Sequence, residues 1–195
     1  MQTLIRHETF NPLRIMIPIR RLVSLVLLAT ANMALATGDI PNEPLARQSP
    51  ASWCNEIEVP AGNRVSARLY AQGVQIYRWN GSAWTFVAPE AGLFADPHLH
   101  GAVGFHDAGP TWEAADGSRV VAARLAGCTP DPDSIPWLLL QATATTGHGR
   151  FGSVTFIQRI HTQGGLAPEV AGSVIGEEAR VPYVAEYVFY RRSRE

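Results

Sequence analysis

Segments of alternating apolar and polar residues, separated by turn signals, follow one another from residue 57 to residue 192 of the chain. In the first clear segment, Arg64–Ala71, apolar side chains occupy every second position, which predicts a strand with one buried face. No segment in this range shows the convincing spacing of an amphipathic helix. The pattern therefore predicts an all-β single domain, a sandwich or small barrel of about seven to nine mainly antiparallel strands.

The stretch YRWNGSAWTF, residues 77–86, is expected to form a hairpin, because its Asn-Gly pair accepts the positive φ angles of a two-residue turn. That turn places Tyr77 opposite Trp84 and brings all the aromatic side chains of the stretch onto one face. Either the arm and long loops cover this face, or it forms an open surface for a ligand. The ligand-binding candidates are Tyr77, Trp79, Trp84 and Phe86, with Trp112 and Arg159 from other segments.

Asp116-Gly117 is a second turn signal of the same kind. A two-residue turn at this point places Trp112 opposite Val121, with Glu113 on the face away from Trp112. The apolar run at residues 135–145 predicts a strand buried on both faces. The final strand, residues 181–192, is expected to present one apolar face made of Tyr183, Ala185, Tyr187 and Phe189.

The first part of the chain has the organisation of a secretory signal peptide. Basic residues ending at Arg21 precede an uncharged, mostly apolar run from Leu22 to Leu35, which closes with small residues at the expected cleavage point after Ala36. The run is shorter than the roughly 20 apolar residues of a membrane span, although an uncleaved anchor is the alternative. We expect a signal peptide at 1–36 starting from Met1 or Met16, an extended arm at 37–56 and a β domain at 57–192. The mature chain is then secreted or periplasmic, with no stable membrane span.

Charge and motif content exclude several functions. Removing residues 1–36, which hold four Arg and one Glu, changes the net charge from −1 to −4, so a nucleic acid partner is not expected. The chain contains no Lys, which excludes Schiff-base chemistry and a phosphate-binding P-loop. It also has neither G-x-G-x-x-G nor G-x-S-x-G. No cofactor is expected.

A cluster of histidines suggests metal binding. His98 and His100 have the His-x-His spacing that places two imidazoles on one face of a strand, and His106 follows closely. Asp96 or Asp107 would add an oxygen ligand. The alternative is a solvated loop whose histidines bind nothing.

A catalytic reading uses His106 with Asp107 or Glu113, because a histidine beside a carboxylate can act as a general base. Two carboxylates, such as Glu113 with Asp107 or Asp116, would instead suit glycoside hydrolysis. The alternative is that Glu113 pairs with an arginine and holds the sheet together; the candidates are Arg119 and Arg159.

Polar residues interrupt the strand at 151–162. Alternation places Arg159 and His161 on one face and Gln158 on the other, with Thr162 following. An arginine at an interior position marks an ion pair or a bound carboxylate.

The chain has two cysteines, Cys54 and Cys128. In an exported protein an even number of cysteines predicts a disulfide, and the alternative is two free thiols.

Several motifs occur together in a recognisable order. The chain resembles the secreted bacterial and fungal family catalogued as domain of unknown function 3455, from about Pro60 to Tyr190. The resemblance implies an exported, mainly β protein and no particular activity. The motifs are GVQIYRWNGSAWTFVAPEAGLF, HDAGPTWEAADGSRVV, IPWLLLQA, VTFIQRIHTQGGLAP and VPYVAEYVFY.

The leading functional hypothesis is a non-catalytic, exported β domain that binds a glycan or a small amphipathic ligand through its aromatic residues. The first alternative is a secreted hydrolase that uses Glu113 with His106 or Asp107. The second is a structural envelope protein without a ligand, whose aromatic residues are all buried and whose partner is another protein.

Overall fold

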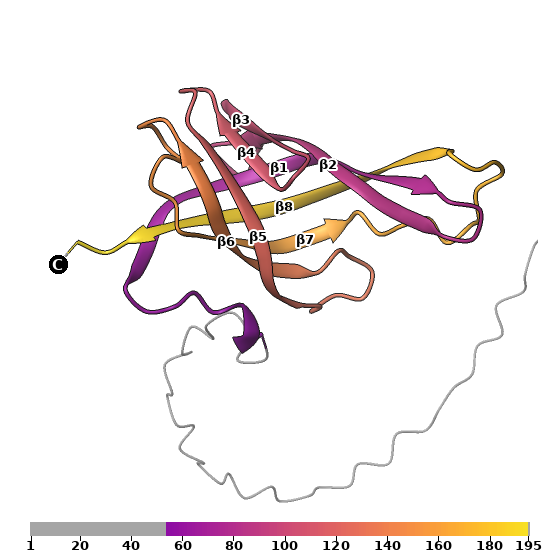
Figure 1. Cartoon of the computed structure of the whole chain (residues 1–195), viewed down its shortest axis with the longest axis horizontal. Coiled ribbons are helices and arrows are strands. Elements are labelled where there is room, and N and C mark those ends of the chain that lie inside the picture. The colour runs from indigo at the N-terminus through magenta and orange to yellow at the C-terminus, as the bar shows by residue number, and fades with distance from the viewer. Residues whose placement is uncertain (1–53, 195) are drawn as a thin grey trace, which may run out of the picture. The chain divides into compact units, whose positions relative to one another are not determined.

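The computed structural model describes residues 54–194, so the expected signal peptide and nearly all of the expected arm lie outside the described residues. Eight strands form one closed antiparallel barrel, in which each strand pairs with the next and the last returns to the first (Figure 1). The all-β prediction is confirmed, and its barrel alternative is the one observed. The elements are η1 (Asn55–Ile57), β1 (Asn63–Trp79), β2 (Trp84–Phe94), β3 (Ala102–Asp107), β4 (Thr111–Ala114), β5 (Arg119–Cys128), β6 (Trp137–Thr146), β7 (Phe156–Gly164) and β8 (Glu178–Arg192).

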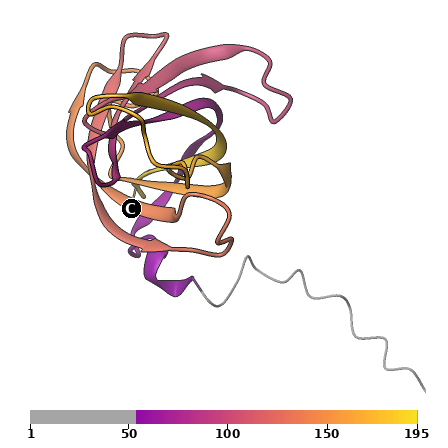
Figure 2. The same ribbon diagram turned by 90° about the vertical axis from the view of Figure 1, so that its right-hand side faces the viewer.

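The strands curve around a common interior, seen from one end of the molecule in Figure 2. Every second side chain of a strand points into this interior and joins one large apolar cluster. The predicted apolar face of β8 is confirmed, since Tyr183, Ala185, Tyr187 and Phe189 are all buried there. Removing a large aromatic or aliphatic side chain from water contributes about 1.5–3 kcal/mol, so this shared interior is the main source of stability. Among residues 54–194, no helix is long and apolar enough to cross a membrane.

The expected strand at 135–145 is buried on both faces only near its beginning. Leu140 points into the barrel, whereas Leu139 packs on the outside against Ile57 and Cys54. From Gln141 onwards the strand is largely exposed. The reason is that β7 pairs with β6 only as far as Gln141, so among the described residues the rest of β6 pairs with β5 alone.

The first hairpin has a different register from the predicted one. Trp79 pairs with Trp84 and Tyr77 pairs with Phe86, so four residues, 80–83, make the turn. The Asn80 carboxamide oxygen accepts hydrogen bonds from the backbone amides of Ser82 and Ala83, both at 2.9 Å, and this bonding favours the longer loop. The shift is two residues, so the aromatic side chains still share one face.

The second hairpin differs from the prediction by one residue. Trp112 pairs with Val120, and Glu113 pairs with Arg119. Gly117 has a φ of 79° and donates its amide to the Ala114 carbonyl, which adds a bulge to the turn. Glu113 nevertheless points away from Trp112, as expected.

Beyond the barrel, β1, β2 and the start of β8 continue as a projecting extension, at the right of Figure 1. β2 pairs with β3 only from Ala91 onwards, so its first half is held by β1 alone. A Cβ atom at Gly73 would lie 2.1 Å from the Glu90 carbonyl oxygen, which shows how closely β1 and β2 approach where the extension begins. The β7–β8 loop, residues 165–177, runs along this extension.

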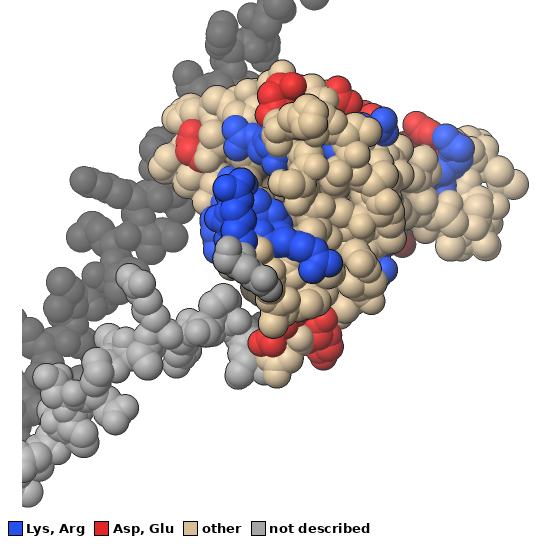
Figure 3. Space-filling view, turned by 60° about the vertical axis from the view of Figure 1, so that its left-hand side comes forward, with Lys and Arg blue, Asp and Glu red and all other residues tan. Residues whose placement is uncertain are grey.

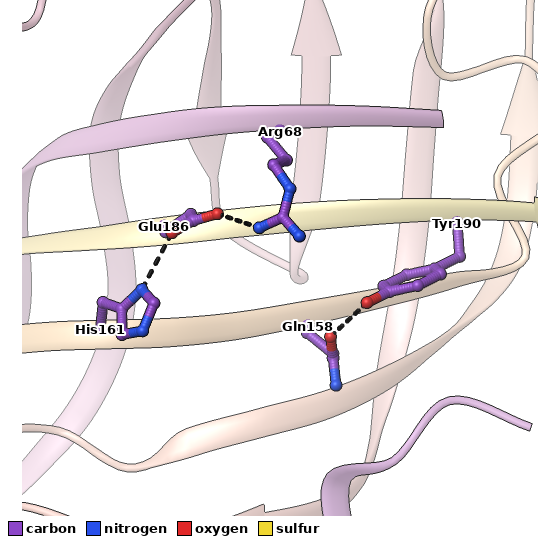
Figure 4. Close-up of polar contacts among 5 residues, drawn as sticks. All are labelled: Arg68, Gln158, His161, Glu186 and Tyr190. Atoms are coloured by element: carbon purple, nitrogen blue, oxygen red, sulfur yellow. Dashed lines mark hydrogen bonds and ion pairs between the residues drawn. The ribbon is translucent and has the colours of Figure 1, made fainter. Parts of the chain in front are cut away.

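A polar network on the outer surface ties three strands together (Figure 4). The Glu186 carboxylate on β8 lies 2.5 Å from the Arg68 guanidinium on β1 and 2.9 Å from the His161 Nδ1 on β7. Alternation alone predicts that His161 shares the face of Arg159. Instead, the pairing of β7 with β8 shifts between Ile160 and Gln163, and His161 adopts a φ of 50° within this bulge. The bulge directs His161 outwards.

The predicted disulfide between Cys54 and Cys128 is confirmed, with the two Cα atoms 5.6 Å apart. It attaches the segment before β1 to the last residue of β5. Ile57 packs against the outside of β6, and its carbonyl accepts a hydrogen bond from the Gln158 side chain at 2.7 Å. The disulfide therefore holds a covering segment on the barrel wall.

Replacing both cysteines by serine, C54S together with C128S, is expected to lower the free energy of unfolding by about 4 kcal/mol, because the bond closes a long loop in the unfolded chain. Urea unfolding of the oxidised protein and of the double variant measures the difference. The variant Ser173→Ala, which changes an exposed side chain far along the chain, controls for the general effect of substitution. A double variant as stable as the oxidised protein would contradict this role of the disulfide.

Candidate functional site

Arg159 is a cation inside the barrel wall. Its neighbours across the sheet are Leu138 on β6 and Tyr187 on β8, which both belong to or pack against the interior cluster. Its Nε and one terminal nitrogen donate to the Pro136 carbonyl oxygen at 3.1 and 2.8 Å. Among residues 54–194 it takes part in no ion pair. The arginine expected at an interior position is thus half-buried without a carboxylate partner.

Four buried polar atoms from the same interior lack a hydrogen-bond partner among the described residues. Each belongs to a side chain that is at most 3% exposed. An unpartnered buried donor costs about 1–3 kcal/mol, so several of them in one interior require an explanation. All four can donate a hydrogen bond, and with Arg159 they form a group of donors inside the barrel. The atoms are Gln75 Nε2, Trp112 Nε1, the Tyr183 hydroxyl and the Tyr187 hydroxyl.

The phenols of Tyr183 and Tyr187 remain protonated. Burial raises the pKa of both, and the nearby Tyr187 further raises the pKa of Tyr183. The positive charge of Arg159 opposes the shift in each case but is the smaller effect. Gln75 and Tyr187 lie close enough to Tyr183, and Arg159 close enough to Tyr187, to shift the pKa of these phenols through their polar groups. These four side chains therefore form one polar cluster inside the barrel.

His106 supports the aromatic interior and stays neutral. Its ring stacks on Trp112, with centroids 4.3 Å apart and planes 6° apart, and meets Tyr187 edge-on. Its Nδ1 lies 2.8 Å from the Thr111 carbonyl oxygen, so the neutral tautomer donates from Nδ1. Burial lowers its pKa from 6.5 to about 4. His106 thus holds the Trp112 indole in place.

Of the candidate catalytic residues, Asp107 and Glu113 share the outer face of the sheet, whereas the His106 side chain is buried on the inner face. His106 points into the barrel, and Asp107 follows it in β3, so the Asp107 side chain points outwards. Glu113 pairs with Phe105 on the same outer face. The Asp116 carboxylate accepts hydrogen bonds within and next to its own turn. Hydrogen bonds from the Ser118 side chain and from backbone amides lower its pKa to about 2.

The expected arginine partners of Glu113 lie in different places. Arg119 is directly opposite Glu113 on the neighbouring strand, although no ion pair joins them in the described part of the chain. Arg159 belongs to the interior site instead.

The histidines of the expected metal site also lie in different parts of the structure. His98 and His100 lie in the loop before β3, with ring centroids 6.2 Å apart and a 3.7 Å contact between His100 and Asp96. His106 is buried beside Trp112. Within residues 54–194 no group of three or more His, Cys, Asp or Glu side chains is placed to hold a metal ion.

The β7–β8 loop covers most of the aromatic face of the first hairpin. The Trp84 indole donates to the Val170 carbonyl at 2.8 Å, and Gly172 packs so closely that a Cβ atom there would lie 2.5 Å from the Trp79 ring. The Tyr77 hydroxyl donates to the Gly165 carbonyl at 2.7 Å. Phe86 remains 54% exposed. Three of the four aromatic candidates therefore contact the loop; Tyr77 is buried, and Trp79 and Trp84 are partly buried.

A separate cleft of about 460 Å³ lies on the outer surface where the extension leaves the barrel. Glu90 and Arg180 line it and form a 2.8 Å ion pair, and Phe105 and Asp107 border the other side. Because Glu90 is already paired with Arg180, the cleft offers no matched pair of unengaged carboxylates.

Trp112 and Arg159 are ligand-binding candidates from the sequence, and the structure adds Gln75, Tyr183 and Tyr187 to the same interior. Tyr183 and Tyr187 were recognised only as part of an apolar face. The available signal was Gln75, a polar residue at an inward position of an alternating strand. Its partners come from other strands, which one sequence does not place beside it.

Comparison with known proteins identifies a family and nothing more specific. Residues 60–191 match the model of the family described as "Protein of unknown function (DUF3455)". No curated protein and no solved structure matches the chain.

Substituting Gly172→Ala is expected to displace the β7–β8 loop, because the added Cβ would overlap the Trp79 ring. Overpacking of this kind destabilises by about 1–3 kcal/mol. Acrylamide quenching of tryptophan fluorescence should increase, while the neighbouring exposed substitution Ser173→Ala should leave it unchanged. Equal quenching in the wild type and in Gly172→Ala would show that the loop does not shield Trp79.

Stability is expected to fall as the pH decreases from about 6.5 to about 4, because the folded pKa of His106 is depressed to about 4 and the unfolded chain binds a proton first. The full effect is about 3 kcal/mol. Urea unfolding across this range measures it. His106→Gln should flatten the dependence, whereas His148→Gln, which leaves His106 in place, should retain it. A dependence unchanged in His106→Gln would assign it to another group.

Proposed function

The chain belongs to the DUF3455 family of proteins of unknown function, and we propose that it is a non-catalytic barrel that binds a small amphipathic carboxylate in its interior. The observation behind this proposal is the Arg159 cation, which has no carboxylate partner among residues 54–194, in an interior where four buried polar atoms also lack a partner among those residues.

The chemistry of these groups favours a carboxylate. A guanidinium presents several N–H donors in a planar arrangement that matches two carboxylate oxygens. Arg159 uses donors on two of its nitrogens for Pro136, which leaves others for a ligand. The hydroxyls of Tyr183 and Tyr187 and the indole of Trp112 supply neutral donors. A carboxylate placed among them would satisfy groups that the protein leaves unpaired.

The remaining part of the ligand is expected to be apolar. Leu69, Ile135 and Leu138 belong to or pack against the cluster that contains Trp112 and Tyr187. A small ring or branched chain suits such walls. The β7–β8 loop over the aromatic hairpin favours the interior as the binding position, since a glycan on the hairpin face would require that loop to move.

The arrangement supports binding more than hydrolysis. The interior groups are donors with a neutral histidine beside them, and Asp107 and Glu113 project from the other face of the sheet. A hydrolase needs a base and a nucleophile or water directed at one bond. The alternative of a structural envelope protein without a ligand does not explain why these buried donors lack hydrogen-bond partners.

We also propose that the protein works outside the cytoplasm. The intramolecular disulfide supports an oxidising compartment, either the periplasm or the medium. The signal-like segment at 1–36 agrees with this destination. Fractionation of cells that express the full chain, followed by mass determination of the product, tests both the location and the cleavage after Ala36. Retention of an unprocessed chain in the cytoplasm would contradict this part of the proposal.

Titration calorimetry with benzoate, benzyl alcohol and benzylamine tests the chemistry of the site, because the three share a ring and differ in charge. Benzoate should bind in a saturable manner and change the tryptophan fluorescence through Trp112. Benzyl alcohol should bind more weakly, and benzylamine should not bind. Absence of benzoate binding, or equal binding of all three, would contradict a carboxylate site.

Arg159→Gln should weaken benzoate binding at least about tenfold, because a hydrogen bond to a charged group contributes about 1.5–3 kcal/mol. The matched control is Arg124→Gln, which removes the same charge from an exposed position on β5. Circular dichroism establishes that both variants remain folded. Equal loss of affinity in the two variants would show a general charge effect and not a site at Arg159.

A further inference from the structure

Two arginines face each other where β1 begins and β8 ends. Arg64 pairs directly with Arg191 in the antiparallel ladder, and the next residue, Arg192, pairs with Asn63. Like charges directly opposite one another destabilise a sheet. Arg194 follows within two residues of the strand end. The barrel therefore concentrates positive charge at one end, at a cost in stability.

No acidic side chain offsets this charge in the described part of the chain. None of Arg64, Arg191, Arg192 and Arg194 forms an ion pair among residues 54–194. Figure 3 shows basic side chains gathered in one continuous patch on this face, with acidic ones at its margins. Arg64 and Arg191 lie at opposite ends of the domain sequence, and the pairing of β1 with β8 brings them together.

The four arginines surround a hollow and do not lie on a flat surface. They line a pocket of about 320 Å³ together with Ser153 and Thr155. The Nε of Arg191 is buried without a hydrogen-bond partner, so one guanidinium donor is already removed from water and unengaged. The Thr155 hydroxyl is fixed by the Asn63 side chain at 2.7 Å, and its amide donates to the Tyr190 carbonyl at 2.8 Å. Hydrogen bonds to β1 and β8 thus fix the position of Thr155 in the pocket.

We propose that this arginine pocket binds a doubly charged phosphate group. Several guanidinium groups around one hollow match the oxygens of a phosphate and neutralise its charge. The anion would remove the repulsion between Arg64 and Arg191 and would supply an acceptor for the buried Arg191 Nε. The pocket lies at the end of the strands, and none of its lining residues belongs to the interior carboxylate site, so the two proposals stand independently.

The first test is titration calorimetry with inorganic pyrophosphate at low and high salt. Binding should be saturable and should weaken as salt screens the charges. Arg64→Gln and Arg191→Gln should each reduce the affinity about tenfold, whereas Arg124→Gln should not change it. No binding, or an equal loss in all three variants, would overturn the proposal.

The second test uses stability without any anion. Arg64→Gln removes the like-charge pair, so it should raise the melting temperature by roughly 1–5 °C while it lowers the affinity for pyrophosphate. If Arg64 only stabilised the sheet, its substitution would instead lower the melting temperature. Lower stability of Arg64→Gln combined with unchanged pyrophosphate affinity would overturn the proposal.

A lipid headgroup and a free phosphate present the same charged group to the arginines. A third experiment therefore distinguishes these two sources of the phosphate. Co-sedimentation with phosphatidylcholine vesicles, with and without phosphatidic acid, tests the lipid source. Binding to phosphatidic acid vesicles that is lost in Arg64→Gln would support the site and assign it to a headgroup. Pyrophosphate binding without vesicle binding would support the site and assign it to a free phosphate.

Discussion

The pairing of β1 with β8 is the constraint on which the rest of the structure depends. It runs from Asn63 opposite Arg192 to Arg78 opposite Glu178, and it joins the first strand of the domain to the last. Without it the sheet would be open, with exposed edges and one face uncovered. With it, the inward side chains of all eight strands share one interior. The Glu186 network on the outside adds polar contacts between β1, β8 and β7 at the same seam.

A closed interior has to be filled, and aromatic rings fill it together with aliphatic side chains. Trp112 meets Tyr187 and Phe189 edge-on, and His106 stacks on the Trp112 ring. A barrel built only for stability would complete such a core with apolar side chains, since unpartnered polar atoms weaken it. Here Gln75, the two tyrosine hydroxyls and Arg159 interrupt it. This departure from the simplest packing is the reason for proposing that the interior binds a ligand.

Much of the fold could be predicted from local patterns, and the site could not. Alternation identified the strands and the inward face of β8, and Asn80 and Gly117 marked both turns. The registers were wrong, because side-chain hydrogen bonds at Asn80 and a bulge at Gly117 lengthened the turns beyond two residues. Likewise, one bulge beside His161 separated it from Arg159. The interior polar cluster and the arginine pocket both contain residues from strands far apart in the sequence. Barrel closure brings these residues together, and it depends on pairing between distant strands, which local patterns do not show.

The β7–β8 loop links the aromatic hairpin to the interior site. Its first residue, Gly165, accepts a hydrogen bond from Tyr77, and a Cβ atom there would lie 2.9 Å from Tyr183 and 3.1 Å from Gln75. Further along, the same loop packs on Trp79 and binds the Trp84 indole. The hairpin aromatics therefore anchor a loop whose beginning closes over two of the unpartnered interior groups. The hairpin thus fixes the loop, and the loop encloses Gln75 and Tyr183.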